Sequence, residues 1–244
     1  MKKVATTLLT AACVLGLASL GFAQAPTLNE IVMNDVSTDD VEFIEICGEP
    51  GTDLTAFTVV VIEGEGSSQG IIDRAFTMGG IIGPSGFYTL SDAHTCADGP
   101  LGNSIENGGN TFLLVRDFTG AVGQDIDAND DCIADGPIGL IVDGIGVGKP
   151  SSGDCTYYGV QQLGPDTGDD GTNDYDVAGL ARCQDCDGDW GMICLAGTEG
   201  DPVCDTNNAF NPYVVTNATP CGPNACAPVS VDDASWGKVK AGYR

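Results

Sequence analysis

Apolar residues in this chain come in short runs, and Gly, Asp, Asn and Pro separate one run from the next. Runs of four to eight residues bounded by turn-forming residues, with few stretches of helical period, are typical of β-strands. Their spacing of roughly 10–15 residues favours a β-sandwich with Greek-key connections. The clearest predicted strands are residues 28–33, 41–47, 57–62, 86–90, 111–115 and 138–142.

Two of these runs differ in how their residues alternate. The character of the side chain changes at nearly every position through residues 41–47, which predicts a half-buried strand with one solvated face. Residues 59–62 contain no polar side chain. That second pattern predicts a strand that is covered on both faces or lies at the centre of a sheet.

The apolar density falls after about residue 154, where Asp, Gly and Cys dominate. This part has too little apolar surface to form a core of its own, so we predict long loops and a few strands that disulfides hold on the sandwich. The predicted organisation is an all-β sandwich over residues 24–224 with Cys-rich loops from about 154, followed by a tail over residues 225–244.

The N-terminus has the pattern of a secretory signal. Lys2 and Lys3 precede an apolar run over residues 8–20, and a small-residue cleavage site ends at Ala23. The run is short for a membrane span and lacks a basic flank on its downstream side. A lipoprotein signal at Cys13 is the weaker alternative, since the apolar run continues beyond it. We therefore predict a secreted, extracellular or cell-surface protein, with the periplasm as an alternative, and no transmembrane segment after signal removal.

Cysteine usage agrees with export. Of the 11 cysteines, Cys13 lies in the predicted signal, which leaves an even number. An even count in an exported chain favours disulfides over a zinc site, and no histidine lies near the C-terminal cysteines. We expect five bridges, whose pairing the spacing leaves open. The candidates are Cys47, Cys96, Cys132, Cys155, Cys183, Cys186, Cys194, Cys204, Cys221 and Cys226.

The chain is strongly acidic, with 35 Asp and Glu against nine Lys and Arg. Loss of the two signal lysines takes the formal net charge from −26 to −28. Such a surface repels nucleic acid and anionic lipid, because binding to phosphates depends on Lys and Arg. It suits solubility and the binding of cations.

Several segments occur in an order that resembles a known family. They are Leu-Asn-Glu-Ile at 28–31, Glu-Phe-Ile-Glu-Ile at 42–46 and Asp-Leu-Thr-Ala-Phe-Thr-Val-Val at 53–60. Together they resemble the start of a bacterial exported lamin-tail domain, although Ala56 stands where that family usually has glycine. Residues 86–90, 108–115 and 141–145 are similar to its later strands. Residues 217–224 are similar to its closing Thr-Pro-Gly-x-x-Asn segment, with Cys221 as a departure.

This resemblance implies an immunoglobulin-like β-sandwich and a binding or structural module. It implies no enzymatic activity, and other features agree. His94 is the only histidine, in a segment that we expect to be a surface turn, and no G-x-S-x-G motif accompanies it. An extracellular hydrolase that uses carboxylates of the Cys-rich half is the alternative.

The sharpest local motif is a predicted calcium loop. Asp127, Asn129, Asp131 and Asp135 have the D-x-N-x-D-x-x-x-D spacing of thrombospondin type 3 and dockerin-like loops, and Asp125 precedes them. Calcium takes six to eight oxygen ligands, which alternate residues of a tight loop can supply. Cys132 stands where such loops usually place glycine. The alternative is an Asx-rich turn without metal.

A second acidic segment keeps part of this spacing. Asp166, Asp170 and Asp174 fall four residues apart, and Gly171 lies where the turn needs it. We include these three in the predicted metal-binding set, against the alternative of a flexible acidic loop. Calcium is thus the predicted cofactor.

The last residues differ from the rest of the chain because they are basic and aromatic. Trp236, Val239 and Tyr243 fall at helical spacing, and Lys238, Lys240 and Arg244 lie among them. This end is similar to Trp-Gly-x-x-Lys-x-x-Tyr-Arg endings of other exported bacterial proteins. It either docks on its own acidic body, serves as a sorting, anchoring or partner-binding tag, or is disordered.

From these features we predict an exported, non-catalytic binding or structural module that calcium stabilises. Its expected partner is a protein or a cell surface. A second copy is the alternative partner, with the basic tail of one copy on the acidic face of the next, which builds filaments.

Overall fold

The computed structural model describes residues 24–33, 41–102, 104–106, 108–148, 153–164, 178–193, 213–215, 218–224 and 226–228. The predicted signal, the predicted metal ligands Asp166, Asp170 and Asp174, and the basic tail lie outside these residues. Within the described part, no helix is long and apolar enough to cross a membrane.

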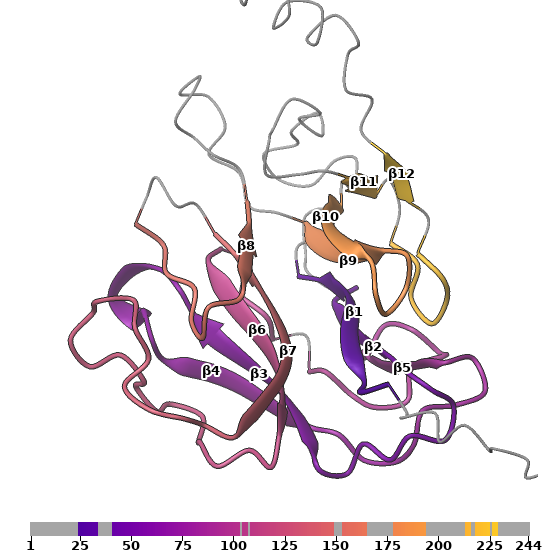
Figure 1. Ribbon diagram of the computed structural model, residues 1–244, viewed down its shortest axis with the longest axis horizontal. Coiled ribbons are helices and arrows are strands. Elements are labelled where there is room, and N and C mark those ends of the chain that lie inside the picture. Colours follow the sequence, from indigo (N-terminus) through magenta and orange to yellow (C-terminus); the bar gives the residue numbers. More distant parts are fainter. Residues whose placement is uncertain are drawn as a thin grey trace, which may run out of the picture.

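The protein consists of two β-sheets that pack face to face (Figure 1). One sheet has seven strands in the order β12-β11-β10-β9-β1-β2-β5. All neighbours in it are antiparallel except β10 and β11. The bounds are β1 Thr27–Val32, β2 Phe43–Cys47, β5 Phe87–Leu90, β9 Gly179–Cys183, β10 Asp189–Ile193, β11 Tyr213–Val215 and β12 Cys226–Pro228.

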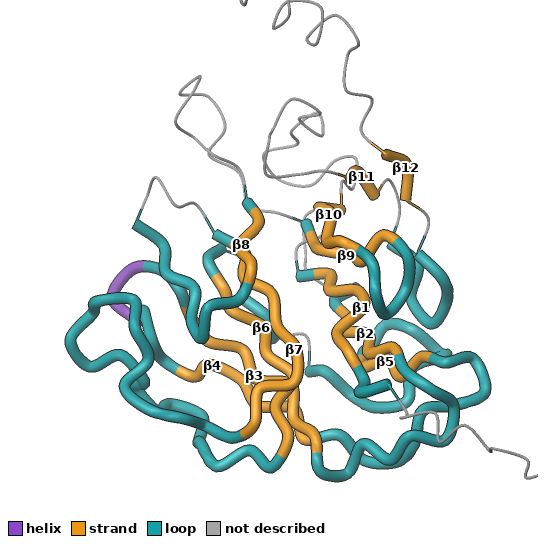
Figure 2. Tube along the Cα trace, in the orientation of Figure 1, coloured by secondary structure: helices purple, strands orange, loops and turns teal. Residues whose placement is uncertain are grey.

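The other sheet has five strands in the order β4-β3-β6-β7-β8, with a parallel pair at β7 and β8. Loops form most of the remaining described chain (Figure 2), and one short 3₁₀ helix, Gly66–Ser68, follows β3. The bounds are β3 Phe57–Glu63, β4 Ile72–Thr77, β6 Asn110–Arg116, β7 Leu140–Val147 and β8 Gln161–Leu163.

The all-β prediction is confirmed, and each of the six predicted runs contributes a strand: β1, β2, β3, β5, β6 and β7. The finer assignment, an immunoglobulin-like sandwich of the lamin-tail type, stays a prediction. The pattern did not reveal β4, in which Asp73 and Arg74 interrupt the apolar run, or the strands of the Cys-rich part.

Strands of the Cys-rich part complete the seven-stranded sheet. The β9–β10 hairpin lies beside β1, with Glu30 opposite Ala181 and Val32 opposite Gly179. Glycine is required at position 179, because a Cβ atom there would lie 2.2 Å from the carbonyl oxygen of Ile31. β1 therefore becomes an inner strand, paired on both sides.

The main core lies between the sheets. Val59 and Val61 on β3 and Phe112 on β6 point into it, as do Leu28 and Ile31 on β1, where an irregularity in the register between Leu28 and Glu30 shifts the alternation by one residue. All are inaccessible to solvent. Burial of apolar area on this scale is the largest favourable contribution to folding.

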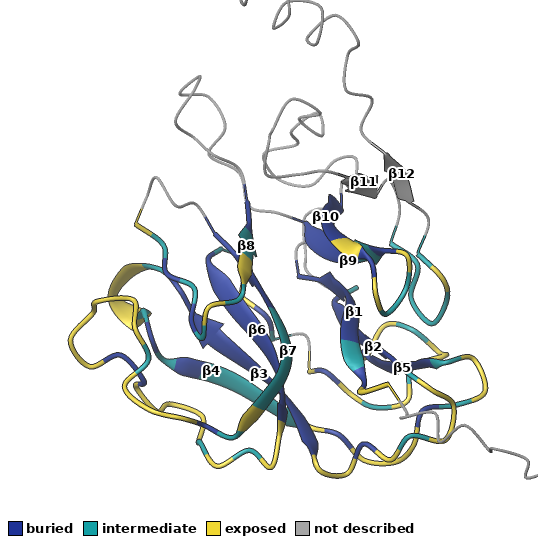
Figure 3. Ribbon diagram, viewed as in Figure 1, coloured by how far each residue is buried: buried dark blue, intermediate teal, exposed yellow. Residues whose placement is uncertain are grey.

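Loops also cover the outer face of each sheet (Figure 3). Val60 and Ile62 of β3 pack in a second apolar cluster with Ile126, so β3 is buried on both faces, as its unbroken apolar run predicted. The prediction of a half-solvated β2 was wrong, because every residue of this strand is buried. Its outer face carries Phe43 and Glu45, and segments distant in sequence cover both.

Three disulfides are present among the described residues, Cys47–Cys186, Cys96–Cys221 and Cys132–Cys155, and Cys183 is disulfide-bonded as well. These bonds indicate an oxidising, extracytoplasmic environment. Because Cys186 pairs with Cys47, the Cys183-x-x-Cys186 sequence is not a redox pair. In each of the three bridges one cysteine has a left-handed backbone: Cys132, Cys186 and Cys221, with φ of 64°, 68° and 64°.

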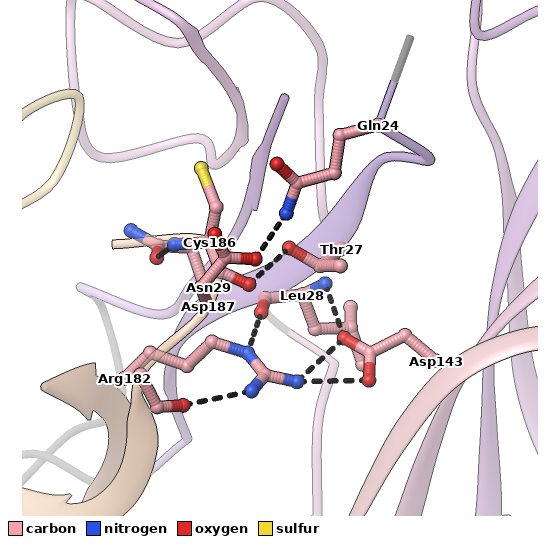
Figure 4. A network of polar contacts seen from close by, with 9 residues as sticks. Gln24, Thr27, Leu28, Asn29, Asp143, Arg182, Cys186 and Asp187 are labelled. Atoms are coloured by element: carbon pink, nitrogen blue, oxygen red, sulfur yellow. Dashed lines mark hydrogen bonds and ion pairs between the residues drawn. The ribbon is translucent and has the colours of Figure 1, made fainter. Parts of the chain in front are cut away.

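One arginine, whose side chain is 13% exposed, connects the two sheets (Figure 4). Arg182 on β9 forms a bidentate ion pair with Asp143 on β7, at 2.8 and 2.9 Å. Its Nε donates to the carbonyl oxygen of Leu28, whose N–H in turn donates to Asp143 Oδ2. The guanidinium also lies 4.5 Å from the Trp190 ring centre, in cation–π geometry. β9, β7 and β1 are thus held by a single charged group.

We expect Arg182→Met to lower the free energy of unfolding by about 3 kcal/mol, because it leaves the largely buried carboxylate of Asp143 without its charged partner. Arg116→Ala is the matched control, since Arg116 forms an exposed ion pair with Asp117, worth less than about 1 kcal/mol. Urea denaturation of both variants measures the difference. Equal losses in the two variants would show that the Arg182 pair does not hold the sheets.

Candidate functional site

The most concentrated polar arrangement lies on the outer face of the seven-stranded sheet, beneath residues 218–224, which we call the cover. Glu30 of β1 is fully buried there. Its carboxylate oxygens accept hydrogen bonds from the N–H of Thr219, at 3.0 and 3.1 Å. The Thr219 hydroxyl lies 3.0 Å from Glu30 Oε2 and 2.8 Å from Asn224 Oδ1. The cover thus supplies polar partners to a carboxylate that the sheet itself leaves unpaired.

Glu45 of β2 is the second fully buried carboxylate. Its Oε1 accepts a hydrogen bond from Asn29 Nδ2 at 2.9 Å. Its Oε2 accepts from the Thr89 hydroxyl at 3.1 Å and from the N–H of Cys221 at 2.7 Å. Donors from β1, β5 and the cover therefore converge on one side chain.

Asp185, in the turn between β9 and β10, completes the network. Its Oδ1 accepts from Asn29 Nδ2 at 3.2 Å and from the N–H of Asn224 at 2.9 Å. The amide of Asn224 donates to the carbonyl oxygens of Asn29 and Arg182. The Asn-Glu of the first strand and the Asn of the closing segment, far apart in sequence, thus interact directly.

The pKa values of both glutamates are strongly shifted. Burial raises the pKa of Glu30 to about 7, against the opposing hydrogen bonds from Thr219. Burial likewise raises the pKa of Glu45 to about 7, against hydrogen bonds from Asn29, Cys221 and Thr89. The charges of neighbouring carboxylates, Glu45 beside Glu30 and Asp185 beside both, raise these values further.

A second loop closes this face from the other side. His94 packs edge-to-face on Phe43 of β2, with 5.4 Å between ring centres, and Cys96 bridges to Cys221 in the cover. The predicted surface turn is present, and the His94 ring within it is half-buried against the sheet. The histidine has a packing role in this arrangement.

A separate pair of carboxyl groups lies at the end of β3. The buried side chain of Glu63 forms a hydrogen bond with the side chain of Glu106, which requires a shared proton. Burial and the charge of Glu106 raise the pKa of Glu63 to about 7. Asn110, opposite Glu63 in the β3–β6 register, has a buried Oδ1 that accepts no hydrogen bond from the residues that the structure describes. These groups come from strands β3 and β6 and the loop before β6.

The predicted calcium loop forms a hydrogen-bonded turn against the five-stranded sheet. The carboxylate of Asp127 is fully buried and accepts hydrogen bonds from the N–H groups of Asp131 and Cys132 and from the Tyr157 hydroxyl. Burial alone would raise the pKa of Asp127, but these hydrogen bonds outweigh it and lower the pKa. Cys132 adopts the left-handed backbone that glycine would supply, and its bridge to Cys155 anchors the turn.

The other predicted ligands of this loop bind its backbone or one another. Asp125 accepts from the N–H of Asp127, Asp135 from that of Ala128, and Asp131 from Ile133 and from Asn129 Nδ2. Among the described residues, no three acidic, cysteine or histidine side chains form a group that could hold a metal ion. The arrangement matches the Asx-turn alternative, and calcium binding here stays a prediction.

Sequence reasoning singled out the acidic motifs but missed the two buried glutamates as a site, and it missed Arg182 altogether. The signal for the first was present, since the motif segments at 28–31, 42–46 and 217–224 supply most of the network. No family model, curated protein or solved structure matches this chain. The lamin-tail resemblance therefore stays a prediction.

We expect the protein to gain stability as the pH falls from 7.5 toward 5. Glu30, Glu45 and Glu63 bind protons more tightly when folded, with a pKa of about 7, than when unfolded, with a pKa of about 4.5. The free energy of unfolding therefore rises as the pH falls through this window, in total by on the order of a few kcal/mol. Asp127, whose folded pKa is lowered, opposes this only below its ordinary value of 3.8.

Urea denaturation across this range measures the effect, and Glu30→Gln is the diagnostic variant. It removes one titrating group, so its stability should depend less steeply on pH than that of the wild type, whatever its absolute stability. An identical slope in the two proteins would contradict the shifted pKa of Glu30.

We expect Asp127→Ala to lower the free energy of unfolding by about 2–3 kcal/mol in the presence of a chelator, because it removes a buried carboxylate that accepts three hydrogen bonds. Asp135→Ala, which removes one exposed acceptor, is the matched control and should cost less. If Asp127→Ala left the free energy of unfolding unchanged in the presence of the chelator, the role of Asp127 as a hydrogen-bond acceptor would be contradicted. The calcium prediction requires a further stabilisation of the wild type by calcium that Asp127→Ala abolishes.

Proposed function

We propose that this protein is an exported, non-catalytic binding or structural module whose anionic surface engages a cationic partner segment. The observation that carries the proposal is the imbalance of charge on the described surface. Each of the three arginines in the described residues is ion-paired with an aspartate: Arg74 with Asp73, Arg116 with Asp117 and Arg182 with Asp143. Their charge is thus already neutralised.

Exposed carboxylates remain in large excess over these pairs. They lie on several loops of the sandwich and at the start of β10, and include Glu49, Asp53, Asp92, Asp98, Glu106, Asp125, Asp130, Asp131, Asp135, Asp187 and Asp189. Such a surface attracts cationic segments over several ångströms and accelerates their association, in a way that salt screens. Charge complementarity therefore predicts that the partner segment is rich in Lys and Arg.

The carboxyl groups with raised pKa support a structural role rather than a catalytic one. Glu30 and Glu45 are inaccessible to solvent and accept hydrogen bonds from the protein's own N–H and O–H groups. A hydrolytic acid must instead reach its substrate. Glu63 is buried as well, and its side chain interacts with the neighbouring carboxyl group of Glu106.

The basic C-terminal end of the chain is itself a candidate for this cationic partner segment. Residues 232–244 hold Lys238, Lys240 and Arg244, three of the nine basic residues. If this segment is the partner, docking within one copy gives a closed monomer, and docking on the next copy gives the self-assembling alternative. Both arise from the same interaction.

The test uses a labelled peptide of residues 232–244 and the full mature chain, in which Lys238→Gln, Lys240→Gln and Arg244→Gln neutralise the competing tail. Fluorescence anisotropy should show binding at low salt that weakens steeply as NaCl is raised. A peptide with the same three glutamine substitutions is the control and should bind at least about tenfold more weakly.

Equal binding of both peptides, or binding insensitive to salt, would contradict the electrostatic proposal. Sedimentation of the wild-type chain over a range of concentrations then separates the two geometries. Larger species that grow with concentration and dissolve at high salt favour assembly, and a monomer at all concentrations favours docking within one copy.

A further inference from the structure

The three disulfides differ in how far solvent reaches them. Cys47 and Cys155 are buried, at 3% and 1% exposure, so their bridges are shielded on one side. Cys96 is exposed and Cys221 is only half-buried. Thiol–disulfide exchange needs an approach to sulfur. Cys132 and Cys96 are both exposed, but Cys96–Cys221 is the one of the three described bridges in which neither cysteine is buried.

This accessible bridge is also the covalent tie that holds the cover. Cys221 lies in the middle of residues 218–224, and its N–H donates to Glu45. Among the described residues, every hydrogen bond that Glu30 accepts comes from Thr219, two positions away. Movement of the cover would therefore remove these hydrogen bonds of Glu30 and the Cys221 hydrogen bond of Glu45, while Asn29 and Thr89 would still donate to Glu45.

Apolar packing contributes little to holding the cover. Ala218 is its one residue in the outer apolar cluster of Val32, Phe43 and Ala181. No residue of the cover is fully buried, and Pro223 is exposed. A segment with few buried apolar contacts lies at the low end of local stability, so its closed position depends on hydrogen bonds and on the bridge.

We propose that residues 218–224 are a redox-latched cover, which opening of the Cys96–Cys221 disulfide releases from the outer face of the seven-stranded sheet. An external dithiol supplies the two electrons. The S–S bond breaks, Cys96 and Cys221 become thiols, and the dithiol becomes a disulfide. Release exposes Glu30 and Glu45 together with the outer apolar cluster of Val32, Phe43 and Ala181. The ion pair between Arg182 and Asp143 keeps the two sheets together.

The test is amide hydrogen exchange on the full mature chain, with the double variant Cys96→Ser/Cys221→Ser, which lacks the bridge and leaves no thiol of this pair. The N–H groups of Thr219 and of residue 221 should exchange at least about tenfold faster than in the oxidised wild type. The amides of Ile31 and Ile44, within β1 and β2, should keep their protection. Cys132→Ser/Cys155→Ser, which removes a bridge elsewhere, is the matched control and should leave Thr219 protected.

Two results would overturn the proposal. Unchanged exchange at Thr219 would show that hydrogen bonds alone hold the cover. Loss of protection from hydrogen exchange throughout β1 and β2 would show that the bridge stabilises the whole sheet rather than the cover alone.

Mild treatment of the wild type with dithiothreitol gives an independent readout. Alkylation and mass mapping should find Cys96 and Cys221 modified first, with Thr219 exchange rising in parallel. Earlier modification of the other bridged cysteines would likewise contradict the latch.

Discussion

The guanidinium of Arg182 lies between the two sheets, where it pairs with Asp143 and binds the backbone of Leu28. A buried charge is costly unless it is paired and hydrogen-bonded, so this contact tolerates little change in the spacing of β9, β7 and β1. Once β1 is fixed, its next two residues, Asn29 and Glu30, are fixed on the outer face of the sheet. The position of the buried carboxylate network therefore depends on the ion pair between Arg182 and Asp143.

The network beneath the cover is unfavourable without its covering segments. Glu30 and Glu45 are acidic groups on a sheet face that would be solvated if the sandwich ended there, and burial makes their ionised forms costly. The protein supplies N–H and O–H donors from the cover and ties that segment with a disulfide. Cys221 and Cys186 both hold left-handed backbones at such ties, a conformation that costs an L-residue about 1 kcal/mol or more. Covalent bonds here maintain a geometry that local preferences disfavour.

The sequence pattern predicted the strands whose apolar residues are contiguous, and it could not predict features that depend on distant contacts. β3 is the clear success, because an unbroken apolar run requires two covered faces. β2 shows the limit: its alternation indicates a solvated face, and only residues 218–224 and the loop that carries His94 and Cys96 cover that face. Arg182 was missed because a lone arginine carries no local signal, and its partner Asp143 lies 39 positions away.

The candidate site could be predicted only in part, because it also depends on contacts between segments that are distant in sequence. The motif segments that contain Asn29, Glu45 and Asn224 were recognised in order, but sequence alone does not show that they meet. The acidic loop near Asp127 has the spacing of a cation site, and the same spacing also serves a turn in which each carboxylate accepts backbone N–H groups. Spacing cannot distinguish these two uses, since both need oxygens on alternate residues.

The central claim is that the folded, oxidised protein keeps Glu30 and Glu45 buried beneath the cover and protonates them near neutral pH. The most direct measurement is a ¹³C NMR titration of the glutamate carboxyl carbons in the mature chain, with Glu30→Gln and Glu45→Gln to assign the signals. Glu30 and Glu45 should both titrate with midpoints near pH 7. Midpoints near the ordinary value of about 4.5 for both residues would contradict it.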